Sequence, residues 1–142
     1  MFLRKGTILK NKNFCFLKFL ILSFFYFTAS QDVAQDKSLL DQYQVTHILN
    51  LAYGVENVFE DDFNYLKLDI LDEPTTDIIQ YFDKCYDFIE EGIQRGNCLV
   101  HCNAGVSRST AICCAFLMKK DKIKYKEALA LVYYDGDIVI VN

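Results

Sequence analysis

Segment 99–119 places an apolar run, a tight loop and a helix-forming run directly one after another. The apolar run that leads to His101 has the composition of a buried strand, and residues 111–119 favour a helix. In the loop between them, HCNAGVSRS, five residues separate Cys102 from Arg108. At such a junction the backbone N–H groups of the loop and of the first helical turn point at one spot, where the helix dipole favours negative charge. The segment therefore predicts an anion-binding cradle.

Two side chains of this loop add chemistry to the cradle. Arg108 has a planar guanidinium that can bind two phosphate oxygens at once. Cys102 lies at the bottom of the loop, and helix N-termini and nearby cations lower the pKa of a thiol from about 8.5 to about 3.5–7.5. Gly105 has no Cβ and lets the loop close tightly. A buried structural cysteine is the alternative, but it leaves the spacing of Cys102, Gly105, Arg108 and Ser109 unexplained.

A thiolate that attacks a phosphate monoester needs an acid to protonate the departing oxygen. A carboxyl group on a separate loop facing the cradle would serve, and Asp72 follows a predicted strand and precedes Pro74. Asp69 is the second candidate, although it still lies within that strand. A solvated turn aspartate is the competing interpretation of Asp72.

Two neighbours of the loop have roles that the sequence leaves open. Ser109 could donate to the sulfur of Cys102 and stabilise it as a leaving group, or it could serve backbone groups at the start of the helix. His101 is expected to point away from the phosphate. It either fixes the loop by a hydrogen bond and helps to set the pKa of the thiol, or it is a histidine of the core with satisfied hydrogen bonds.

Length and charge limit the classes of protein to which the chain can belong. Its 142 residues suffice for one domain, and 52% of them are hydrophobic. Residues 1–30 carry five Lys and Arg side chains and no carboxylate, whereas the whole chain has a net charge of −4, so the remainder carries −9. An acidic body argues against nucleic acid as a partner.

The cysteines indicate free thiols rather than disulfides or a metal site. None of the six is spaced C-x-x-C, and two histidines are too few to suggest zinc. Cys113 and Cys114 are adjacent in a predicted helix, which is poor geometry for a bridge between them. We therefore expect a reducing compartment, which a thiolate nucleophile also requires.

Strands alternate with helices along the chain, which predicts an α/β fold with a mostly parallel central sheet flanked by helices. Strands are expected at 46–52, 64–70 and 97–101. Helices are expected at 31–44, 77–95, 108–120 and 125–134, the second of them capped by Thr75 or Thr76 and ended by Gly96. The cradle then lies at the carboxyl ends of the strands, where ligands bind in such sheets.

The basic and aromatic segment 1–29 has two interpretations. Its longest uncharged run, 19–31, has 13 residues and is too short to span a membrane. A basic start, a short apolar run and the small residues Thr28, Ala29 and Ser30 are typical of a secretory signal peptide. Alternatively, residues 24–29 form the first strand of the sheet.

The loop HCNAGVSRS resembles the signature loop of the cysteine-based dual-specificity protein phosphatases. The run VTHILNLAYGVENVFEDDFNYLKLDILDEPTTDI, residues 45–78, is also similar to that family, and to its small atypical members in particular. The resemblance covers about residues 30–142 and implies the cysteine-phosphatase fold. It also implies that a C-terminal helix of the family is missing here, so 30–142 would be a truncated catalytic domain preceded by the segment 1–29.

The resemblance assigns roles by position. Cys102 would be the nucleophile, Arg108 the phosphate binder and Asp72 the general acid, and Ser109 would assist the breakdown of a phosphocysteine intermediate. The loop would also bind substrate through its backbone N–H groups, which belong to Asn103, Ala104, Gly105, Val106 and Ser107. No metal ion and no organic cofactor are implied. Substrates would be proteins phosphorylated on tyrosine, serine or threonine, with members of stress-activated MAP kinase pathways as candidate partners.

Localisation follows from the chemistry. Cleavage after Ser30 would remove the first strand and send a thiolate enzyme into an oxidising compartment, so we expect the cytoplasm and no membrane association. Secretion or membrane association through residues 1–30 is the alternative.

Two other functions compete with phosphatase activity. A phospho-residue-binding adaptor without activity would be expected to lack Cys102, which is present here together with Arg108 and Asp72. A phosphatase of RNA 5′ ends or phosphoinositides would carry more basic residues around the cradle. Asn103, Ala104 and Val106 are uncharged, and this function therefore ranks last.

Overall fold

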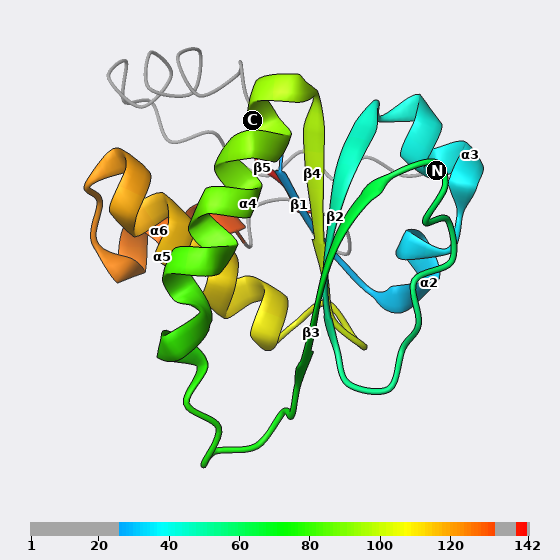
Figure 1. Cartoon of the computed structure of the whole chain (residues 1–142). Helices are drawn as coiled ribbons and strands as arrows, with labels where there is room; N and C mark the ends of the chain where they lie inside the picture. The colour runs from blue at the N-terminus through cyan, green and yellow to red at the C-terminus, as the bar shows by residue number, and fades with distance from the viewer. Residues whose placement is uncertain (1–25, 133–138, 142) are drawn as a thin grey trace, which may run out of the picture.

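The computed structural model describes residues 26–132 and 139–141, which form a five-stranded sheet with helices on both faces (Figure 1). The strands are β1 (Tyr26–Ala29), β2 (Val45–Ala52), β3 (Asn64–Ile70), β4 (Asn97–His101) and β5 (Val139–Val141). They lie in the order β3-β2-β4-β1-β5, with β1 to β4 parallel and β5 antiparallel to β1 at the edge. This arrangement confirms the expected α/β fold with a mostly parallel sheet.

The helices divide between the two faces of the sheet (Figure 1). On one side lie α2 (Gln31–Ala34) and α3 (Lys37–Gln42), and on the other lie α4 (Phe82–Arg95), α5 (Arg108–Asp121) and α6 (Tyr125–Val132). Each side has its own cluster of buried apolar residues. Of the residues that the structure describes, none belongs to a helix that is both long and apolar enough to cross a membrane.

Two predicted helices differ from those observed. The single helix predicted for 31–44 is broken into α2 and α3, because the Asp36 side chain accepts a hydrogen bond from Leu39 N and starts a new helix there. The helix predicted from residue 77 begins instead with the 3₁₀ turn η1 (Ile78–Tyr81), which Asp77 caps by accepting from Ile79 N at 3.2 Å. Neither Thr75 nor Thr76 is its cap. The last two residues of the helix predicted for 125–134 lie outside the described part.

The N-terminal strand belongs to the sheet and supports the loop that follows β4. Strand β1 pairs in parallel with β4, and Ala29 lies opposite His101. Beyond this pair, Cys102 N donates to Ala29 O at 3.3 Å and Gln31 N donates to Asn103 O at 3.2 Å. Residues 26–29 thus form a strand of the sheet, as the first-strand interpretation of this segment expects. The signal-like stretch before Tyr26 lies outside the described residues.

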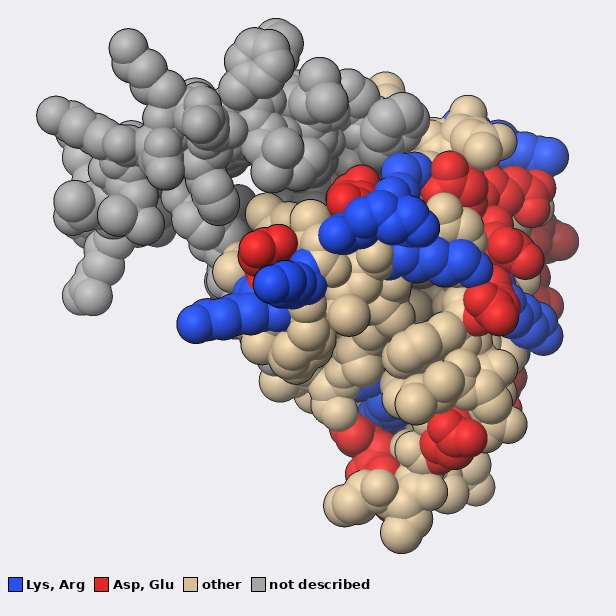
Figure 2. Space-filling model, turned by 90° about the vertical axis from the view of Figure 1, so that its left-hand side faces the viewer, with Lys and Arg blue, Asp and Glu red and all other residues tan. Residues whose placement is uncertain are grey.

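The helical face of α4, α5 and α6 carries basic and acidic side chains in close proximity (Figure 2). Two ion pairs join α5 to α4 there: Lys119 Nζ lies 2.8 Å from Asp83 Oδ1, and Lys120 Nζ lies 2.8 Å from Glu90 Oε2. The first pair is exposed and the second is partly buried, and ion pairs that remain accessible to solvent contribute little to stability. Burial of apolar side chains such as Ile89 and Leu117, neither of which is exposed, therefore dominates the attachment of these helices.

Helix α4 approaches the sheet most closely at Gly92. A Cβ added to this residue would lie 2.9 Å from the Cβ atoms of both Cys98 and His47. A Gly92→Ala variant should therefore lose about 1–3 kcal/mol of unfolding free energy through overpacking, which outweighs the gain of about 1 kcal/mol in helix propensity. Urea denaturation measures the change. Gln94→Ala, at an exposed position of the same helix, is the control, and equal stability of the two variants would contradict the close approach.

Both histidines of the chain are buried in the sheet. His47 shares a hydrogen bond of 2.9 Å with Thr46 Oγ1 and packs edge-to-face on Phe88. Burial lowers the pKa of His47 and lowers the pKa of His101 to about 4, while a weaker interaction with the backbone of Cys102 raises the latter. His101 Nδ1 has no hydrogen-bond partner among the described residues. Its ring is therefore neutral in the folded chain at pH 7.

This burial predicts a pH-dependent loss of stability. His101 binds a proton near pH 6.5 when unfolded but only near pH 4 when folded, so unfolding takes up a proton between these values. The unfolding free energy should fall by up to about 3 kcal/mol from this residue as the pH drops from 6.5 to 4. Urea denaturation across this range should give a shallower decline for His101→Asn than for the wild type. Parallel curves would show that His101 is not the group responsible.

Candidate active site

The loop between β4 and α5 lies at the carboxyl edge of the sheet, as the sequence predicts. Gly105 has φ +74, and a Cβ at this position would lie 2.7 Å from the carbonyl carbon of Ala29. A side chain would therefore be strained by its backbone conformation and would also collide with the end of β1. The loop needs glycine here because it turns back against the first strand.

Cys102 is 1% exposed, and polar donors surround its sulfur. Gly105 N donates to Sγ at 3.2 Å, and Ser109 Oγ lies 3.3 Å from Sγ. Burial alone would raise the pKa of Cys102. Hydrogen bonds from the Ser109 hydroxyl and from the backbone N–H groups of Ser109 and Gly105, together with the charge of Arg108, outweigh burial and lower this pKa below its ordinary value. The loop therefore favours the thiolate.

Arg108 is 6% exposed, and backbone carbonyls at the sheet edge hold it in place. Its Nη1 donates to Ile70 O at 2.7 Å and to Leu51 O at 3.4 Å, and its Nη2 donates to Asn103 Oδ1 at 2.8 Å. Its Nε has no hydrogen-bond partner among the described residues. A buried charged donor without an acceptor is unusual in a folded protein, and an anion in the cradle would supply one.

The structure brings Asp72 to the cradle and keeps Asp69 elsewhere. Asp72 lies two residues beyond β3, and its side chain is 50% exposed. Its Oδ1 accepts a hydrogen bond of 2.7 Å from Ser107 Oγ, and its Oδ2 lies 3.5 Å from Arg108 Nη2. Asp69 instead accepts from Gly54 N at 3.2 Å and lies 3.7 Å from Lys67 Nζ. The geometry thus favours Asp72 over Asp69 as the carboxyl group of the site.

Two side chains have contacts that the sequence did not indicate. The sequence assigns only the backbone N–H groups of Asn103 and Ser107 to the site, yet the Asn103 amide contacts Arg108 and the Ser107 hydroxyl contacts Asp72. Ser107 and Asp72 are 35 residues apart, so no local periodicity reveals the pair. The neighbouring side chains of Ala104 and Val106 are exposed and uncharged.

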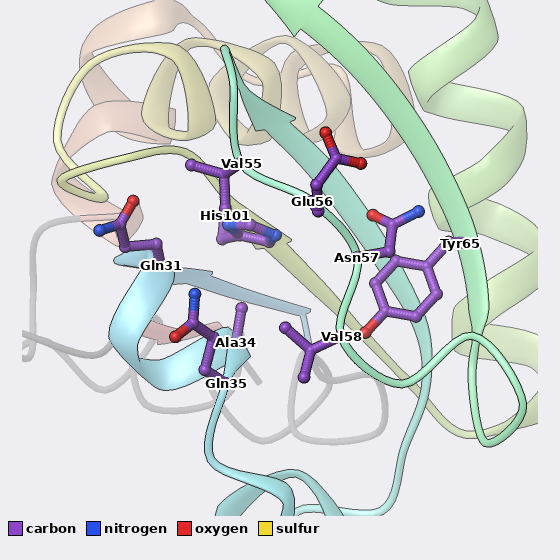
Figure 3. A pocket seen from close by; sticks show the side chains of 9 residues that line it. All are labelled: Gln31, Ala34, Gln35, Val55, Glu56, Asn57, Val58, Tyr65 and His101. Atoms are coloured by element: carbon purple, nitrogen blue, oxygen red, sulfur yellow. The ribbon is translucent and has the colours of Figure 1, made fainter.

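His101 points away from the cradle into a small pocket on the α2 side of the sheet (Figure 3). The pocket is lined by Gln31, Ala34, Gln35, Val55, Glu56, Asn57, Val58, Tyr65 and His101. Asn50 fixes the loop that forms one wall, because its Nδ2 donates to Val55 O at 2.8 Å and to Asn57 Oδ1 at 3.0 Å. Cys102 and His101 thus face opposite sides of the sheet.

The other cysteines of the described part differ from Cys102. Cys85, Cys98, Cys113 and Cys114 are buried and free, and burial raises the pKa of each, to about 12 for Cys85 and about 11 for Cys114. Within the described ranges, no group of three or more His, Cys, Asp or Glu side chains could hold a metal ion. The groups that the structure brings together at the site are the thiol of Cys102, the guanidinium of Arg108, the carboxyl group of Asp72 and the hydroxyls of Ser107 and Ser109.

Several known proteins are similar to this chain in sequence and in fold. The family described as "Dual specificity phosphatase, catalytic domain" matches residues 25–142. Dual specificity protein phosphatase 19 of Mus musculus is 52% identical over 104 residues, which cover 72% of this chain and 47% of the mouse protein. MAP kinase phosphatase with leucine-rich repeats protein 1 of Dictyostelium discoideum is 41% identical over 98 residues, 69% of this chain and 12% of that protein. The chain thus spans less than half the length of these relatives.

A solved structure supports the same grouping. The human tyrosine phosphatase-like serine/threonine/tyrosine-interacting protein superposes with a TM-score of 0.70 at 35% identity, over 74% of this chain and 75% of that one. The family match extends over all the strands described above and includes the loop between β4 and α5. The chain therefore belongs to the dual-specificity protein phosphatase family.

Proposed function

We propose that the chain hydrolyses phosphate monoesters of proteins, on tyrosine and on serine or threonine, through a phosphocysteine intermediate. The observation that carries this proposal is the buried Arg108, whose Nε lacks an acceptor in the same loop that favours the thiolate of Cys102. A phosphate dianion would accept hydrogen bonds from Arg108 and from the loop N–H groups, and it would be brought to the sulfur.

In the first step the Cys102 thiolate attacks phosphorus, an S–P bond forms and the P–O bond to the substrate breaks. The electron pair of that bond goes to the departing oxygen, which takes a proton from Asp72. Asp72 is suitably placed because one of its carboxyl oxygens lies 3.5 Å from the guanidinium that would hold the phosphate.

In the second step the Asp72 carboxylate takes a proton from a water molecule, which attacks phosphorus as the S–P bond breaks. Inorganic phosphate leaves, and the sulfur departs as a thiolate. Ser109 Oγ, 3.3 Å from Sγ, supports this departure by donating to the developing negative charge. His101 has a supporting role, since it precedes Cys102 and is buried at the end of β4 on the other side of the sheet.

For partners we propose phosphorylated proteins, including kinases of MAP kinase pathways. The similarity to a Dictyostelium discoideum protein named as a MAP kinase phosphatase supports this choice.

For localisation we propose a reducing compartment such as the cytoplasm. Five free buried cysteines among the described residues support it, since they would require no oxidising environment.

Hydrolysis of para-nitrophenyl phosphate and of phosphotyrosine and phosphothreonine peptides tests the activity. We expect turnover by the wild type and none by Cys102→Ser, because a hydroxyl is far less acidic than a thiol. Asp72→Ala should reduce kcat by roughly a hundredfold or more, the usual contribution of a general acid. A folded wild type that binds phosphopeptide without turnover would contradict the proposal. That result would favour the phospho-residue-binding adaptor.

Alkylation with iodoacetamide tests the thiolate independently of any substrate. The rate at Cys102 should reach half its maximum at a pH below the ordinary thiol value of about 8.5. Ser109→Ala should move this midpoint upward, because the variant lacks a hydrogen bond that lowers the pKa of Cys102. Mass spectrometry should find Cys85, Cys98, Cys113 and Cys114 unmodified while the chain is folded. A midpoint that Ser109→Ala does not change would contradict this role of the hydroxyl.

A further inference from the structure

We propose that the Ser107 side chain is a positioning residue that orients Asp72 for proton transfer to the departing oxygen. The inference rests on the proposed function and adds a role for a hydroxyl that neither binds the phosphate nor contacts the sulfur. It starts from the hydrogen bond of 2.7 Å between Ser107 Oγ and Asp72 Oδ1.

Ser107 occupies the N-cap of α5, yet its hydroxyl makes no capping hydrogen bond. Serine at this position normally accepts from a backbone N–H group of the first turn. Here only the backbone carbonyl takes part in the helix, by accepting from Ala111 N at 2.9 Å. The hydroxyl is directed instead to the carboxyl group of another segment.

The contact distinguishes the two oxygens of Asp72. Ser107 holds Oδ1, and Oδ2 lies 3.5 Å from Arg108 Nη2 at the cradle. Proton transfer from Oδ2 leaves the bond at Oδ1 intact, because a hydroxyl can donate to that oxygen before and after the proton departs. The hydrogen bond can thus persist through both steps of the reaction, while the other oxygen exchanges its proton.

Little else restrains the segment that carries Asp72. Residues 71–75 are exposed, and the Asp72 side chain is 50% exposed. The second contact of the carboxyl group is the Arg108 guanidinium, which a bound phosphate would engage. With substrate present, Ser107 is therefore the partner that still fixes the carboxyl group, and the free rotation of an exposed aspartate would otherwise reduce the fraction in a productive orientation.

The experiment compares two substrates with the same ring and different leaving groups. The para-nitrophenolate ion leaves readily without a proton, whereas phenolate from phenyl phosphate depends on the acid. The measured quantity is the ratio of kcat/KM for para-nitrophenyl phosphate to kcat/KM for phenyl phosphate, because kcat/KM includes every step up to departure of the leaving group. Ser107→Ala should raise this ratio by roughly tenfold, a part of the full effect of a general acid.

Four further variants make the test specific. Ser107→Thr keeps the hydroxyl and should restore a ratio close to that of the wild type. The double variant Ser107→Ala with Asp72→Asn should have the same ratio as Asp72→Asn alone. Ser107 acts only by orienting the acid, so its loss has no further effect once the acid has been replaced by an amide. Ser38→Ala, at an exposed serine of α3 on the far side of the sheet, controls for the loss of any surface hydroxyl.

The outcomes separate the inference from the proposed function. An equal loss of kcat/KM on both substrates in Ser107→Ala would overturn the inference, since it would assign the residue to phosphate binding or loop shape. A ratio in the double variant that exceeds that of Asp72→Asn would overturn it as well. In either case the proposed function would still hold if the wild type is active and Cys102→Ser is not. A folded wild type inactive on both substrates would overturn the proposed function and this inference together.

Discussion

The guanidinium of Arg108 holds together three parts of the molecule that are distant in sequence. Its Nη1 donates two hydrogen bonds, to carbonyls at the ends of β2 and β3, and its Nη2 donates one to the Asn103 side chain in the loop. Burying a cation with mainly neutral acceptors costs free energy, because the only carboxylate within ion-pair distance among the described residues, that of Asp72, is half-exposed. The side chain is thus held in a position where an anionic ligand would lower its energy. The buried guanidinium of Arg108 therefore determines both the shape of the cradle and its preference for an anion.

The contrast between Cys102 and the other cysteines shows what this arrangement achieves. All five described cysteines are buried, and Cys102 belongs to the same apolar cluster as Cys85, Cys98, Cys113 and Cys114. Desolvation raises the pKa of the other four, and only at Cys102 do N–H and O–H donors reverse the effect. Nucleophilicity in this chain therefore comes from a few directed hydrogen bonds at the end of one strand.

Local sequence was sufficient to predict most of the fold and to nominate the side chains that the structure brings together at the loop between β4 and α5. Strands β2, β3 and β4 and the start of α5 follow from short-range composition, and Asp72 could be located because it comes just after a strand on the same edge. The break between α2 and α3 and the cap at Asp77 were missed, since several neighbouring residues could serve as caps and tertiary packing selects one. The contact between Ser107 and Asp72 depends on how separate segments meet in space, which no local pattern encodes.

The position of β1 has a consequence for how the chain acquires its cradle. Ala29 supplies the acceptor for Cys102 N and borders Gly105, so the floor of the loop is built from segments that are far apart in the sequence. During synthesis β1 emerges early, but its partner β4 follows only after β2, β3 and α4 have been made. Contacts of such long sequence separation form slowly, because much chain entropy is lost before they contribute. The nascent chain therefore carries β1 without its β4 partner until β2, β3 and α4 have been made, and its reactive thiol is set in place only when the two strands pair.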